Sequence, residues 1–393
     1  MKNQFKILTL LLITSAMSYG QRHQILKRSV EVDKNTSVVL NFENIYVAIE
    51  ESIDGKIHFD YSLEFDGYSK KDTQKQLGMI SAKVTNFDNG VTLKAKSGNQ
   101  ITFETFKFTA EHGISIDERY FNSKSDTIIR KSKDSILKEL KKNNRLDWKG
   151  SSLKYINKRF KRIDKDGKLS NLRKGNMDIM RSQFVIKIPP FVKININAKN
   201  SGIYFRNDMS NELSVKLNSG KFIAKTFYNS YNRIKIEDAN VEVEGIFGGD
   251  YEFKNVKKGK IGSTQNVKIK SEFSKIEIGE IARNTIVTDF NSEYWFYNWS
   301  KDFERFNLYS EYSKIHFFYP KSNHSFKVIG NNTKHIVGKN FVANLQPTSK
   351  GEKYTMMTKA PHLGETLSGR IFFDIVHGII YSHNDSIKTI NKN

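Results

Sequence analysis

The feature that most constrains the fold of this chain is a strand-like sequence that occurs twice. SEFSKIEIG, residues 271–279, returns 39 residues later as SEYSKIHFF, residues 310–318. Around these copies, short apolar–polar alternations separated by Asn, Ser, Gly and Asp fill the range 182–320, which is typical of half-buried strands joined by turns. Near-identical strands at a steady period favour a stack of repeats. We therefore predict an all-β chain wound as a β-solenoid, like a single-stranded β-helix, with a β-sandwich as the alternative.

An alignment of three copies predicts which side chains point outward. The aromatic residue after the turn is Phe273, Tyr294 or Tyr312, at spacings of 21 and 18 residues. Because strand side chains alternate between faces, the outward candidates for binding are Phe273, Tyr294, Phe296, Tyr312, Lys275 and Lys314. The core face is then predicted to hold Ile276, Ile278, Ile315, Phe317, Trp295, Tyr297 and Trp299. The outward aromatic side chains could stack on sugar rings or form a ladder that only stabilises the sheet.

The N-terminus reads as an export signal. Lys2 and Lys6 precede an apolar run at 7–13, and the small residues of 18–20 lead to a cleavage site before Gln21. The apolar run is shorter than the ~20 residues that span a bilayer. The sequence therefore predicts export to the periplasm, the outer-membrane surface or the medium, with no transmembrane segment in the mature chain. With no Cys in the sequence, disulfides and thiolate sites are excluded.

Composition divides the chain into five zones. We expect a signal peptide, N-terminal strands that begin the solenoid, a basic insertion, the solenoid repeats, and C-terminal strands with a polar tail, at 1–20, 21–110, 111–181, 182–320 and 321–393. Two short helices are predicted, at Lys70–Ile80 and, within the insertion, at Asp134–Lys142.

The charge of the chain points to an anionic partner. The formal net charge is +22, and residues 121–181 hold 19 Lys and Arg against 7 Asp and Glu. Such an excess attracts polyanions, so for an exported protein we expect acidic polysaccharide, lipopolysaccharide or another envelope protein. Aromatic residues interleave with the basic zone at Trp148, Tyr155 and Phe160, as a nucleic-acid groove would require, although nucleic acid is the less expected partner. The alternative is a solvated, partly disordered insertion.

No pattern in the sequence carries catalysis. The nine His residues show no metal-binding spacing, and nucleophile elbows, phosphate-binding loops and dinucleotide glycine patterns are absent. Adjacent carboxylates such as Glu50 and Glu51 have nothing to place them across a cleft. We therefore predict no enzyme activity, no metal and no cofactor. A polysaccharide lyase on a β-helix remains the alternative, because fold does not fix function.

Several segments resemble the bacterial putative-adhesin β-strand-repeat proteins, which are related to the head domains of autotransporter-type adhesins. VVLNFENIYVAIEESIDGKIHFDYSLE looks like their opening strands, FVIKIPPFVKININAKNSGIYF like the entry to the repeats, and LSVKLNSGKFIAK like a repeat. The resemblance covers roughly 30–100 and 182–320, whereas the insertion and the aromatic residues that replace Gly depart from it. It implies a β-solenoid with a surface or adhesive role, as in exported proteins of Bacteroidetes-like bacteria. The function predicted is thus a non-enzymatic envelope interaction module. An envelope-stress accessory protein is a further alternative.

Overall fold

The computed structural model describes residues 21–108, 114–116, 130–144, 160–163, 169–171, 177–336, 342–347, 353–359 and 369–383. The predicted signal peptide therefore lies outside the described residues, as do parts of the insertion and the C-terminal tail. The described chain is all-β, as predicted: one mixed sheet holds 22 strands and a separate small sheet holds three. The small sheet consists of β7 (Ile114–Ile116), β8 (Phe160–Ile163) and β9 (Leu169–Asn171).

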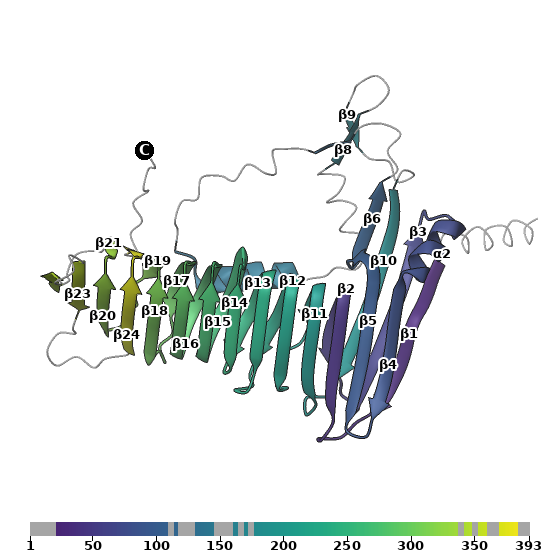
Figure 1. Cartoon of the computed structure of the whole chain (residues 1–393), viewed down its shortest axis with the longest axis horizontal. Helices are drawn as coiled ribbons and strands as arrows, with labels where there is room; N and C mark the ends of the chain where they lie inside the picture. The colour runs from purple at the N-terminus through teal and green to yellow at the C-terminus, as the bar shows by residue number, and fades with distance from the viewer. Residues whose placement is uncertain are drawn as a thin grey trace, which may run out of the picture.

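One end of the large sheet is antiparallel (Figure 1). The strands there pair as β1–β3, β3–β10, β10–β6 and β4–β5. Their bounds are β1 (Gln21–Glu31), β3 (Lys56–Asp66), β4 (Ile80–Phe87), β5 (Gly90–Ile101), β6 (Glu104–Phe108) and β10 (Met177–Ile188). Helix α2 (Lys70–Gly78) lies at this end and confirms the first predicted helix; Ser69 caps it by accepting a bond from the Asp72 N–H. Strand β10 begins inside the range predicted as insertion.

From β5 onward the sheet is parallel, in the row of strands seen in Figure 1. The run comprises β2 (Ser37–Glu51), β11 (Lys193–Phe205), β12 (Leu213–Phe227), β13 (Arg233–Phe247), β14 (Asp250–Lys254), β15 (Lys258–Glu272), β16 (Lys275–Phe290), β17 (Glu293–Trp299), β18 (Arg305–Glu311) and β19 (Lys314–Phe318). Beyond them, β24 (Gly369–Val376) and β25 (Ile379–His383) separate β18 and β19 from β20 (His324–Asn331) and β21 (Lys334–Ile336). Antiparallel β23 (Lys353–Lys359) and β22 (Val342–Pro347) complete the sheet.

A column of left-handed residues divides the parallel run into two faces. These residues have φ between 47° and 63° and lie at equivalent places along the strands; they are Asn44, Asn200, Ser219, Asp238, Asn255, Phe273, Asn291, Tyr312, Asn332 and His377. Asn and Asp tolerate this backbone conformation better than other residues with a side chain. Their recurrence therefore marks the boundary between the two faces, which we call the corner. We call the segments before the corner, such as 193–199 and 213–218, the open face, and the segments after it, such as 239–247 and 275–282, the helix face.

The core lies between the two faces. Alternate side chains along each strand point inward and are buried, and they are almost all apolar on both faces. On the open face, Val215 pairs with Ile234, and on the helix face Val241 pairs with Gly259, so each inward row continues from strand to strand. Hydrophobic burial along these rows and the backbone bonds between strands hold the fold without any disulfide.

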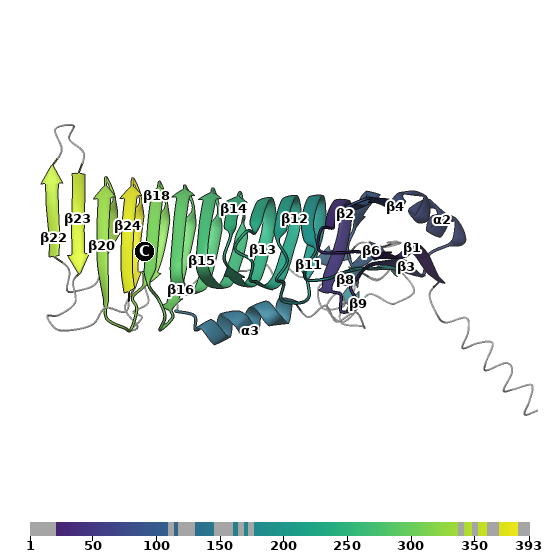
Figure 2. The same cartoon turned by 90° about the horizontal axis from the view of Figure 1, so that it is seen from below.

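Helix α3 (Lys133–Asn144) covers part of the helix face (Figure 2) and confirms the predicted helix at 134–142. Its Ile136 and Leu140 are buried beside Tyr297 and Phe318. Gly262 permits this close approach, because a Cβ there would lie 2.8 Å from Leu137 Cδ2. Two ion pairs, Lys131–Glu277 and Lys133–Glu280, both with N–O distances of 2.5 Å, join the start of α3 and the residues just before it to β16.

The predicted register of the middle repeat is wrong. Tyr294 and Phe296 are fully buried, because Tyr294 pairs with Ile276 and Ile315, and Phe296 pairs with Ile278 and Phe317. The residue that corresponds to Phe273 and Tyr312 at the corner is Asn291, not Tyr294. The sequence alignment was displaced by three residues, and an odd displacement moves every side chain of a strand to the opposite face.

The same displacement misplaces the tryptophan-rich stretch. Trp295 points outward on the helix face, where its ring stacks on His316 at 4.7 Å and Lys275 Nζ lies 4.6 Å above it. Tyr297 is buried as predicted, but beneath α3 rather than inside the sheet. Trp299 packs against the core, as predicted.

Candidate functional site

A basic groove of about 720 Å³ lies on the open face, near the antiparallel end. It crosses β4, β5, β2, β11, β12 and β13, a span of about 24 Å at the usual strand spacing. Its polar lining forms two rows, in which neighbours pair across strands. The first row is Lys83, Lys94, Asn41, Asn197, Lys216 and Lys235; the second is Ser81, Lys96, Glu43, Lys199, Asn218 and Glu237.

The groove has an excess of positive charge. Six lysines line it against two glutamates, and all six lysines are exposed. Five of them make no ion pair with any residue that the structure describes; Lys235 alone does, with Glu252 at 2.9 Å. That hydrogen-bonded carboxylate raises the pKa of Lys235 above its ordinary value. Asn197 donates to Asn41 at 3.3 Å, so amide groups lie between the lysines of the first row.

Farther along the same two rows, opposite charges neutralise one another. Lys254 lies 3.6 Å from Glu237, and Lys270 lies 3.3 Å from Glu272. Exposed pairs of this kind contribute little stability, but they end the positive field of the groove. The lysine-rich part of the open face is therefore confined to the groove.

A second hollow, which we call the cup, has a volume of about 320 Å³ and lies on β15, β16, β18 and β24. Phe290 and Tyr309 are its aromatic residues, with exposed fractions of 38% and 40%. Its ionisable lining is otherwise Lys270, Glu272, Asp289, Glu311 and Asp374. The cup thus carries the opposite charge to the groove.

The floor of the cup is a buried carboxylate. Asp289 is 5% exposed and accepts hydrogen bonds from the hydroxyls of Ser271, Ser310 and Ser313. Below it, the Tyr294 hydroxyl lies 2.6 Å from Ser271 Oγ. Burial and then the charge of Asp289 raise the pKa of Tyr294 well above its ordinary value. The carboxylate is thus held in place by three hydroxyl donors.

Four of the six binding residues proposed from the sequence are exposed. Phe273 and Tyr312 occupy the corner with exposed fractions of 49% and 53%, and Lys275 and Lys314 lie exposed on the strands that follow. Tyr294 and Phe296 are in the core. Phe290 and His377 join Phe273 and Tyr312 in one row of exposed rings, and neither was predicted from the sequence. The ring centroids lie 5.4 Å apart in Phe273–Phe290, 5.8 Å in Phe290–Tyr312 and 5.1 Å in Tyr312–His377. We call this row the aromatic edge.

The signal that could have revealed the true register is the serine after the corner. The Ser274 N–H donates to Ser292 Oγ at 2.9 Å, and the Ser292 N–H donates to Ser313 Oγ at 3.1 Å. Aligning these serines, rather than the aromatic residues, places Phe290 beside Glu311 on the open face.

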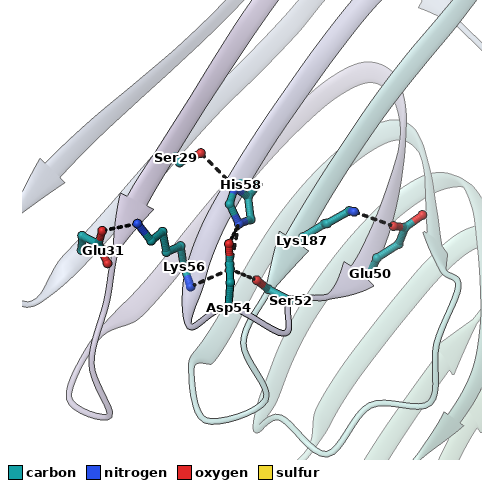
Figure 3. A network of polar contacts seen from close by, with 8 residues as sticks. All are labelled: Ser29, Glu31, Glu50, Ser52, Asp54, Lys56, His58 and Lys187. Carbon is teal, nitrogen blue, oxygen red and sulfur yellow. Dashed lines mark hydrogen bonds and ion pairs between the residues drawn. The ribbon is translucent and has the colours of Figure 1, made fainter.

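A hydrogen-bonded Ser–His–Asp group joins β1 to β3 (Figure 3). Ser29 Oγ lies 2.8 Å from His58 Nδ1, and His58 Nε2 lies 2.9 Å from both carboxylate oxygens of Asp54. The bond to His58 is the main reason that the pKa of Asp54 lies far below its ordinary value. The order is that of an acyl-transfer triad, but Ser29 and His58 are directly opposite on paired strands and lie at the surface. We interpret the group as a cross-strand contact.

Within the described residues, no group of three or more His, Cys, Asp or Glu is placed to hold a metal ion. The described helices also include none that is long and apolar enough to cross a membrane.

Comparison with known proteins places few limits on function. No protein family matches the chain, and no curated protein is similar to it in sequence. Among solved structures, a putative cell adhesion protein from Clostridium sporogenes matches over 93% of this chain and 99% of its own, with 9% identity and a TM-score of 0.18. At those values the likeness carries no argument about fold or function.

Proposed function

We propose that this protein is an exported, non-enzymatic interaction module whose basic groove binds an acidic polysaccharide of the cell envelope or its surroundings. The observation that carries the proposal is the groove itself, in which five exposed lysines have no ion-pair partner among the described residues. An adhesive role, at a surface or in the periplasm, follows from holding such a polymer.

The form of the groove favours a linear polymer. Its rows run across six strands, so that the ligand would lie along the sheet rather than enter a closed pocket. Lysines at both ends of the first row attract negative charge, while Asn41 and Asn197 between them offer amide groups to sugar hydroxyls. A chain that carries one acidic group every few ångströms along its length matches this order better than a small anion does.

The architecture that we propose is a β-solenoid. Between β11 and β19, successive parallel partners are 17 to 21 residues apart, with Arg233↔Asp250 and Asn284↔Arg305 as the extremes, as expected when each turn stacks on the one before. A sandwich of antiparallel sheets has no such parallel run. A solenoid would present the rows of the open face at regular intervals, which suits a repeating polymer.

Export and the absence of catalysis complete the proposal. Export is supported by the signal-like N-terminus of the sequence, in which Lys2 and Lys6 precede the apolar run at 7–13. The groove lysines are all exposed, whereas a lysine that acts as a base is usually desolvated. Incubation with polygalacturonate should therefore leave its chain length and ultraviolet absorbance unchanged; formation of unsaturated product would instead support the lyase alternative.

The binding proposal is tested by removing three groove charges. In the mature protein, Lys94→Gln, Lys199→Gln and Lys216→Gln together should weaken binding to polygalacturonate about 100-fold at low salt, from roughly 1 kcal/mol per charge pair at 4 Å in water. The matched control changes Lys257, Lys268 and Lys327 to Gln; these are exposed, carry the same total charge and lie outside the groove. Equal weakening in both triple variants would refute a groove-specific site. The difference should shrink as salt is added.

A further inference from the structure

We propose that the cup is a second, separate binding site, and that its ligand is a sugar residue with a protonated amino group, such as a glucosamine unit. This inference does not depend on the groove, because the cup lies elsewhere on the open face and carries the opposite charge.

The cup places each aromatic ring beside a carboxylate. Phe290 on β16 pairs with Glu311 on β18, and Tyr309 on β18 pairs with Asp374 on β24. The rows of these two pairs are two residues apart along the strands, or about 7 Å. The two rings thus lie along one side of the patch and the two carboxylates along the other.

The chemistry of this patch selects the ligand. An exposed aromatic face stacks on the C–H face of a pyranose and also attracts a cation. Glu311 and Asp374 make no ion pair with any residue that the structure describes, so both remain available for an ammonium group. A sugar bearing carboxylate or sulfate would meet four carboxylates of the lining and only Lys270 in return, and Lys270 is already paired with Glu272.

The aromatic edge beside the cup supports the same conclusion. Phe273 and Tyr312 have φ values of 51° and 57°, a conformation that bulky side chains rarely adopt. Most residues of this corner column are Asn, Asp or Ser. Phe273 and Tyr312 thus occupy exposed positions whose backbone conformation disfavours bulky side chains. Phe290 of the cup is in ring contact with both of them. The edge would extend the platform to the next residues of an amino-sugar chain.

The experiment is calorimetric titration of the mature protein with a glucosamine hexamer, its N-acetylated counterpart and polygalacturonate, at a pH where the amine is protonated. The glucosamine hexamer should bind, and the acetylated hexamer, which lacks the positive charge, should bind at least about tenfold more weakly. Phe290→Ser with Tyr309→Ser should weaken glucosamine binding about tenfold or more, and Glu311→Gln with Asp374→Asn should do the same.

The control is Tyr228→Ser with Tyr231→Ser, which removes two exposed rings outside the cup, 51% and 74% exposed. It should leave glucosamine binding unchanged. No binding, equal binding of the acetylated hexamer, or equal losses in the cup and control variants would overturn the proposal. The groove variant distinguishes the two proposals: it should lose polygalacturonate and keep the glucosamine hexamer, so that failure of either site leaves the other standing.

Discussion

Replacing Phe296 by Ala should destabilise the protein far more than replacing Phe273 by Ala. Phe296 is fully buried and packs against Tyr294 and Phe306, with ring centroids 5.2 and 4.8 Å apart. Truncation of a buried Phe removes its transfer free energy and leaves a cavity, which together cost about 3–5 kcal/mol. Phe273 is half-exposed, and its ring contact with Phe290 is worth about 0.5–1.5 kcal/mol.

The assay is urea unfolding of both variants, followed by far-ultraviolet circular dichroism. With an m-value of about 3 kcal/mol/M, the loss at Phe296 lowers the midpoint by roughly 1 M or more, whereas Phe273→Ala lowers it by less than about 0.5 M. The alignment made from sequence places both rings outward and would give two small, similar shifts. Similar shifts, or a larger one for Phe273→Ala, would therefore refute the register described above.

Two further predictions concern His383 and the Ser–His–Asp group of Ser29, His58 and Asp54. Burial and then the charge of His316 lower the pKa of His383 from 6.5 to about 4. Neutral His383 therefore contributes its full stability above pH 6.5, and this contribution is lost as the pH falls toward 4. His383→Gln should flatten the pH dependence of the urea midpoint over that interval, and an unchanged slope would contradict the assignment. Ser29 should not react with a fluorophosphonate probe that labels a serine hydrolase in the same tube, because a surface strand pair does not enclose an oxyanion; labelling that disappears in both Ser29→Ala and His58→Ala would show a catalytic triad.

Local patterns predicted the features that depend on neighbours in sequence. Alternation of apolar and polar residues predicted the all-β class, and helical spacing of apolar residues predicted α3, with Ile136 and Leu140 on its buried side. The register of the middle repeat was missed because SEY at 292–294 imitates the SEF and SEY of the flanking copies at the wrong place. Burial depends on the parity of the alignment, so a displacement of three residues exchanged Tyr294 and Phe296 with their neighbours.

The groove could not be found from sequence, since its six lysines come from five strands spread between residues 83 and 235. None of those strands is unusually basic, and only the parallel register brings the side chains into rows. The denser basic run at 121–181 drew the prediction instead, and much of it lies outside the described residues. The cup was hidden for a related reason: Phe290 and Tyr309 look unremarkable until Asp374 of β24, far along the chain, is paired beside Tyr309.

Groove and cup are independent in charge although they share the same two rows. The centre of the groove, near β11, is six strand pairings from β18 in the cup, about 29 Å at the usual spacing. Their facing edges, Lys235 on β13 and Lys270 on β15, are two strand pairings apart, about 10 Å. This exceeds the Debye length of about 8 Å at physiological ionic strength, so salt screens most of the field of each site at the other. Between the two sites, Lys254 is paired with Glu237, and at their facing edges Lys235 and Lys270 are paired with Glu252 and Glu272. No unpaired lysine of these rows therefore leads a polyanion from the groove to the cup. On the two proposals above, the open face would hold an acidic chain in the groove and an amino-sugar chain in the cup, which is the arrangement that a protein linking two polymers requires.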